Sequence, residues 1–98
     1  MKHKKYRVKD EIAWRKMKDG TVTIVSPIID KIISVNETAG MIFELLDGTN
    51  SVEMIVDFMC DKFSENENVL KEDIQTDVLE IIDDFNEREL LDELIDNI

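Results

Sequence analysis

In the first third of the chain, a short segment alternates apolar and polar residues with the period of a β-strand. Residues 21–25 alternate threonine with β-branched apolar side chains, which is typical of a strand with one buried face. Asp19-Gly20 is a hairpin signal, so residues 12–17 supply the strand before it. After a turn at Asp30-Lys31, residues 32–35 (Ile-Ile-Ser-Val) form a third strand. We therefore expect three strands in an antiparallel meander.

After residue 35, the apolar residues take up helical spacing. Asn36 is a good N-cap for a first helix, and Asp47-Gly48 ends this helix because glycine suits the left-handed position after the last turn. Either Asn50 or Ser51 caps a second helix. The expected buried faces are Ala39, Ile42, Phe43 and Leu46 in the first helix, and Val52, Ile55, Val56, Met59 and Phe63 in the second.

A third and longest helix is expected over about residues 71–87. The apolar residues after it, Leu90-Leu91 and Leu94-Ile95, either continue this helix or pack as a separate segment after a break near Arg88-Glu89. The order is β-β-β-α-α-α, which predicts a small α+β domain of winged helix-turn-helix type. The apolar positions of the third helix are Ile74, Val78, Ile81, Ile82 and Phe85.

Charge is distributed very unevenly along the 98 residues, whose net charge is −11. Residues 1–20 carry eight Lys/Arg and three Asp/Glu, whereas residues 21–98 carry four Lys/Arg and twenty Asp/Glu. An acidic body repels phosphate backbones, so we expect no nucleic-acid partner and favour a basic peptide or protein patch. The alternative is an acidic surface that only aids solubility. No apolar run is long enough to span a membrane, and a single cysteine fits a reducing, cytoplasmic setting.

No residues with catalytic spacing are present. His3 is the only histidine and lies in a basic terminus, and Cys60 has no histidine in the folded body that could act as its base. The sequence therefore predicts no enzyme, no cofactor and no metal site. A stripe of carboxylates on the third helix is either a solvated face or a surface for a cation or basic peptide. Its members are Asp73, Asp77, Glu80 and Asp84.

Three motifs lie at the junctions of the expected elements. Residues 35–39 (Val-Asn-Glu-Thr-Ala) join strand to helix, residues 46–55 contain Leu-Asp-Gly-Thr and Ser-Val-Glu-Met-Ile at the next corner, and residues 77–82 (Asp-Val-Leu-Glu-Ile-Ile) precede Leu90-Leu91. Their sequences and spacings resemble those of the family of PQQ-synthesis protein D (PqqD), the small recognition elements of ribosomally made, modified peptides (RiPPs). Glu89 stands where the family has a glycine, which would let the last helix run on.

The resemblance implies a peptide-recognition domain over residues 8–91. It leaves residues 1–7 as a flexible basic N-terminus and residues 92–98 as an acidic C-terminal tail. The implied function is that of a non-catalytic adaptor. Such an adaptor captures the leader segment of a precursor peptide and presents it to a modifying enzyme, which in the family is a radical SAM enzyme or a leader peptidase.

In the family, the leader is expected to add as a strand to the edge of the third strand, in the cleft against the third helix. This agrees with the pattern of the residues, because an open edge displays free N–H and C=O groups. For each apolar member, plain core packing is the alternative. A proline at Ile33 is expected to weaken binding. The residues carried over are Ile32, Ile33, Ser34 and Val35 on the strand, and Ile74, Asp77, Val78 and Ile81 on the helix.

Two other interpretations remain open at this stage. A winged-helix DNA-binding regulator would need a basic recognition helix, but the third helix has Lys71 and Arg88 only near its ends. An exposed edge strand could also pair with its own copy and give a homodimer.

Overall fold

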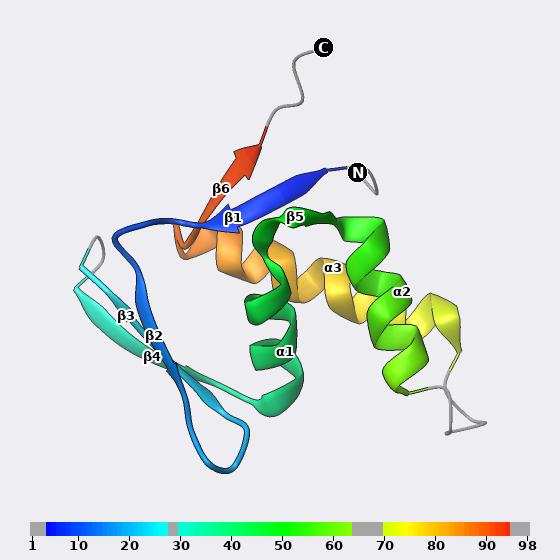
Figure 1. Cartoon of the computed structure of the whole chain (residues 1–98), viewed down its shortest axis with the longest axis horizontal. Helices are drawn as coiled ribbons and strands as arrows, with labels where there is room; N and C mark the ends of the chain where they lie inside the picture. The colour runs from blue at the N-terminus through cyan, green and yellow to red at the C-terminus, as the bar shows by residue number, and fades with distance from the viewer. Residues whose placement is uncertain (1–3, 28–29, 64–69, 95–98) are drawn as a thin grey trace.

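The computed structural model describes residues 4–27, 30–63 and 70–94, and in these it has two antiparallel three-stranded sheets and three helices. The predicted α+β class is therefore confirmed, although the winged-helix name fits only loosely. In Figure 1, one sheet lies on one side of α1 and α2 lies on the other, while α3 crosses behind α1 from the α2 side. The elements are β1 (Lys5–Val8), β2 (Ala13–Lys16), β3 (Val22–Ser26), β4 (Lys31–Val35), α1 (Glu37–Leu45), β5 (Asp47–Ser51), α2 (Val52–Lys62), α3 (Lys71–Glu87) and β6 (Leu91–Leu94).

The first sheet has the order β2-β3-β4 and is the predicted meander. Its central strand carries Val22 and Ile24, both fully buried, and Ile24 lies opposite Ile33 of β4. The β2–β3 turn follows from its sequence, because Asp19 Oδ1 accepts hydrogen bonds from the backbone N and the Oγ1 of Thr21, at 3.0 and 2.7 Å. Ile28 and Ile29, which precede the predicted turn at Asp30-Lys31, lie outside the described residues.

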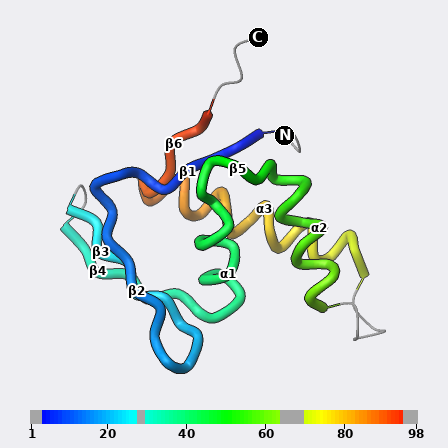
Figure 2. The backbone as a smooth tube through the Cα atoms, in the orientation of Figure 1, coloured from blue at the N-terminus to red at the C-terminus, as the bar shows by residue number. Residues whose placement is uncertain are grey.

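The second sheet has the order β5-β1-β6 and was not predicted. It joins the beginning, the middle and the end of the described chain, and Figure 2 shows the first and last strands running side by side. Residues 1–7 were expected to form a flexible N-terminus. In the structure, Lys5–Arg7 lie in β1 and Tyr6 is only 5% exposed. Asp92–Leu94 of the expected acidic tail likewise lie in β6. The cause is non-local, since these short polar strands are held by pairing with distant segments.

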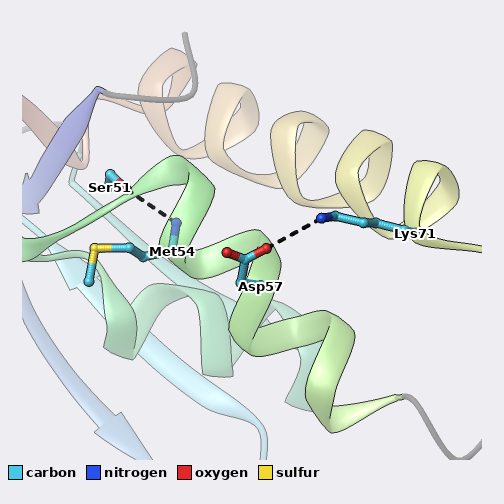
Figure 3. Close-up of polar contacts among 4 residues, drawn as sticks. All are labelled: Ser51, Met54, Asp57 and Lys71. Atoms are coloured by element: carbon cyan, nitrogen blue, oxygen red, sulfur yellow. Dashed lines mark hydrogen bonds and ion pairs between the residues drawn. The ribbon is translucent and has the colours of Figure 1, made fainter.

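Side-chain caps begin the first two helices. Asn36 Oδ1 accepts a hydrogen bond from the N of Ala39 at 2.9 Å, as its type predicts. At α2, Ser51 Oγ accepts from the N of Met54 at 3.2 Å, so Ser51 and not Asn50 is the cap (Figure 3).

The third helix begins and ends close to the predicted residues, and it does not run on. Near its start, Lys71 Nζ lies 3.6 Å from Asp57 Oδ1 of α2 (Figure 3). After its end, Glu89 takes a left-handed conformation with φ of 60°. The chain therefore turns where the family has glycine, and Glu89 carries the strain that a glycine would avoid. Leu90 follows with no exposed surface, so its burial favours the turn.

The core joins the first sheet to the third helix through aromatic rings. Phe43 of α1 meets Trp14 and Phe85 edge to face, with ring centroids 5.6 and 5.5 Å apart. Gly40 allows α1 to lie against β3, because a Cβ there would fall 2.7 Å from Val22 Cγ2. The remaining expected core positions are buried, except that Ala39, Phe63 and Ile81 are half-buried.

Candidate peptide-binding site

An apolar groove of about 230 Å³ lies between α3 and the helices α1 and α2. All four predicted helix residues line it, so the structure brings this half of the predicted site together. The full lining is Thr38, Ile42, Met59, Phe63, Ile74, Asp77, Val78 and Ile81.

A second hollow continues this groove toward the first sheet. It has a volume of about 320 Å³ and shares Thr38, Asp77 and Ile81 with the first. Asn36, the residue directly after β4, also lines it, so the combined groove opens at the end of that strand. None of the four predicted β4 residues lines either hollow, so the two halves of the predicted site meet only at the junction of β4 with α1. The lining of the second hollow is Asn36, Thr38, Ala39, Asp77, Glu80 and Ile81.

The edge of β4 is open, because β4 pairs only with β3 among the described residues. The hydrogen-bonding pattern of the sheet shows which backbone N–H and C=O groups of β4 face this open edge. Met17 N donates to Thr21 O at 2.8 Å, and bonded pairs alternate along an antiparallel ladder. The backbone groups of Thr23 are therefore directed to β2, and those of the next residue, Ile24, are directed to Ile33 of β4. It follows that the N–H and C=O of Ile32 and Ser34 point to the open edge.

This pattern revises the choice of Ile33 for a proline substitution. The backbone N–H of Ile33 is directed to β3, and its side chain is only 8% exposed. A proline there would break the β3–β4 ladder and the core rather than the open edge. Ser34, which is exposed, offers the more direct test of the edge.

The side chains of the strand residues divide between the two faces of the sheet. Ile33 and the half-buried Val35 point toward the core, whereas Ile32 is 75% exposed on the opposite face with Ser34. Ile33 and Val35 thus serve the core with their side chains, and Ile32 and Ser34 contribute their backbone groups to the edge.

The groove also contains residues that the sequence interpretation missed. Thr38 and Ile42 lie one turn apart on α1, and Met59 of α2 lies four residues before Phe63, the C-cap of that helix. Each pair has the i, i+4 spacing of a single helix face. The spacing marks these faces as apolar, but it does not distinguish a groove wall from an interior contact.

Acidic side chains border the groove. Asp77 and Glu80 are exposed at its rim, and no ion pair joins either to another residue in the described part of the chain. Asp84, on the same stripe, is paired with Arg88 Nε at 3.0 Å. The rim therefore presents uncompensated negative charge to any segment lying in the groove.

The site holds no arrangement for covalent chemistry within the described residues. No group of three histidine, cysteine, aspartate or glutamate side chains is placed there to hold a metal ion, and none of the described helices is both long and apolar enough to cross a membrane. What the geometry offers is an open strand edge and an apolar groove with an acidic rim.

Three solved structures have this fold. The chain has a TM-score of 0.76 and 19% identity to TbiB1 in complex with the TbiA(beta) leader peptide, covering 92% of this chain and 99% of that one. Against the PqqD truncation of Methylobacterium extorquens PqqCD, described as a stand-alone RiPP recognition element, the TM-score is 0.69 with 16% identity, covering 89% and 87%. Lasso peptide synthetase B1 complexed with the leader peptide gives 0.69 with 18% identity, covering 93% and 99%.

The family model for coenzyme PQQ synthesis protein D (PqqD) matches residues 17–91, so the chain belongs to the PqqD family, as its motifs indicated. No curated protein matches the sequence.

Proposed function

We propose that this protein binds the leader segment of a ribosomally made precursor peptide and presents it to a modifying enzyme. The observation that carries the proposal is the open edge of β4, which leads into the groove between α1 and α3. The similar structures with bound leader peptides support it, because their chains share this fold.

Binding would divide into two physical parts. The backbone groups of Ile32 and Ser34 would bond to an added strand and supply affinity that tolerates sequence change. The apolar walls of the groove, including Ile42 and Ile81, would select side chains of the leader. Asp77 and Glu80 at the rim would attract leaders that carry Lys or Arg and would raise their association rate at low salt.

The protein would act as a non-catalytic adaptor. Its chemistry is limited to holding the leader, and a radical SAM enzyme or a leader peptidase would modify the precursor. A cytoplasmic location would follow from this role.

Calorimetry with a cognate leader peptide tests the proposal. We expect micromolar or tighter binding, and a Ser34→Pro variant should bind about tenfold more weakly because it loses an outward N–H. Ser34→Ala keeps that N–H and should bind like the wild type.

A matched control lies at the opposite edge of the same sheet. The alternation that frees Ser34 also directs the N–H of Lys16 away from β3, so Lys16→Pro removes an equivalent group from β2. Lys16→Pro should leave the leader affinity unchanged. Absence of binding to the wild type, or equal loss in both proline variants with folding intact by circular dichroism, would contradict the proposal.

A further inference from the structure

The outer face of the first sheet is uncovered and partly apolar. Ala13, Val25 and Ile32 lie side by side across the three strands, and Val25 and Ile32 are 43% and 75% exposed. The helices cover the other face, where Val22 and Ile24 are fully buried. A row of exposed β-branched side chains on an open sheet face is typical of an interaction surface.

A cationic hollow adjoins this row at the β2–β3 turn. Its volume is about 590 Å³. Arg15 and Lys18 make no ion pair with any other described residue, and Asp19 accepts both hydrogen bonds from Thr21. The hollow is thus lined by three cationic side chains against one carboxylate, in a protein of net charge −11. The lining is Arg15, Lys16, Met17, Lys18, Asp19, Thr21, Thr23 and Ser34.

We propose that this outer face docks an acidic surface of a partner protein, and, if the proposed function holds, that this partner is the peptide-modifying enzyme. An apolar row with a charged rim matches the composition of protein interfaces, in which apolar contacts lie centrally and polar groups surround them. The partner would place apolar side chains on Val25 and Ile32 and carboxylates opposite Arg15 and Lys18. Electrostatic attraction would orient the approach.

The geometry disfavours the two other occupants. A two-fold contact between copies of this face would set Arg15 and Lys18 against cations of the same kind. A head-to-tail contact with the acidic α3 of a second copy would build a ring or a filament and would cover the candidate groove. The phosphates of a nucleic acid would contact the cations, but they would leave the apolar row exposed to water.

The same face would be extended by a bound leader. A strand added beside β4 continues the sheet, and alternate leader side chains would then point outward beside Ile32 and Ser34. A protein docked on the outer face would therefore contact this domain and the leader together. The adaptor would in this way present the leader to the docked protein.

Nuclear magnetic resonance with the ¹⁵N-labelled full chain tests the surface without requiring the enzyme. The probe is a synthetic peptide in which Glu alternates with Leu. Comparison probes are the same peptide with Lys in place of Glu, and a short DNA duplex. We expect the Glu peptide alone to shift amides of β2, β3 and the turn between them. Its affinity should fall about fivefold in an Arg15→Gln/Lys18→Gln variant.

The control variant Arg7→Gln/Lys71→Gln removes one Arg and one Lys elsewhere, each from an exposed ion pair with N···O distances of 3.9 and 3.6 Å. Its affinity for the Glu peptide should stay within about twofold of the wild type. Leader binding by the Arg15→Gln/Lys18→Gln variant, measured by calorimetry, should be unchanged, which separates this proposal from the proposed function.

Three results would overturn the proposal. One is the absence of shifts on the outer face, or shifts confined to the groove between α1 and α3. Another is equal or tighter binding of the Lys peptide or the DNA. The last is a dimer in sedimentation that Arg15→Gln/Lys18→Gln dissociates, since the occupant would then be a second copy.

Discussion

The two sheets of this protein use the same turn sequence for different purposes. Asp19-Gly20-Thr21 joins β2 to β3, whereas Asp47-Gly48-Thr49 follows α1 and forms the first three residues of β5. Gly20 and Gly48 have φ of 93° and 91°. Each aspartate accepts from the N and Oγ1 of its threonine, at 3.0 and 2.7 Å in the first turn and 2.9 and 2.6 Å in the second.

The difference between the sheets lies in what the turns connect. The first sheet joins strands that are neighbours in sequence, so its hairpin signals predict it. The second sheet pairs β1 with β5 and β6, and the paired residues lie forty or more positions further along the chain. Local sequence therefore fixes the conformation of the Asp-Gly-Thr segment, and distant pairing decides whether that segment belongs to a strand.

The largest expected effect tests how far the second sheet holds the fold together. Tyr6→Ala removes a side chain that is 5% exposed on the central strand β1, and it should lower the free energy of unfolding by about 3 kcal/mol. Trp14→Ala removes a larger ring from β2 that is 44% exposed, and it should cost only about 1 kcal/mol. Urea unfolding measures both, and a smaller loss for Tyr6→Ala than for Trp14→Ala would show that β1 is dispensable.

A smaller effect is expected where β6 leaves α3. Glu89 has φ of 60°, so Glu89→Gly should relieve strain and stabilise the protein by about 0.5 to 1 kcal/mol. Glu87→Gly, inside the last turn of α3, is the control and should destabilise the protein by up to about 1 kcal/mol. If Glu89→Gly lowers the melting temperature, the strain does not limit stability at this turn.

The smallest effect compares the two turns directly. Hydrogen bonds from Thr49 lower the pKa of Asp47, and those from Thr21 lower the pKa of Asp19, from a model-compound value of 3.8. A depressed folded-state pKa gives stability that is complete above the unfolded-state pKa and is lost as the pH falls through the folded-state value. The stability difference between the wild type and Thr49→Val should therefore be largest above pH 3.8 and shrink below it.

Thr21→Val should show the same pH dependence, because the two turns have the same local geometry. Thermal unfolding as a function of pH measures both variants. A pH-dependent difference in one variant only would mean that tertiary surroundings, and not the tripeptide, set the pKa.

The candidate site was predictable to different degrees on its two sides. Ile74, Val78 and Ile81 follow helical spacing, and the family motif around them placed them on the groove. On the strand, the sequence marked residues 32–35 but not which backbone groups face outward. That choice depends on the hydrogen bond from Met17 to Thr21 in the neighbouring hairpin. Thr38 and Phe63 were missed because only the packing of three helices brings their side chains to one groove.

By itself, the sequence determined the local elements: the β2–β3–β4 meander, the cap at Asn36, the Asp-Gly-Thr turns and the span of α3. Each of these depends on residues close together in the chain, whose preferences act before any distant contact forms. Only the tertiary structure decided the second sheet and the break at Glu89. Their free energy comes from burial and strand pairing between segments far apart in the sequence, which no local pattern records.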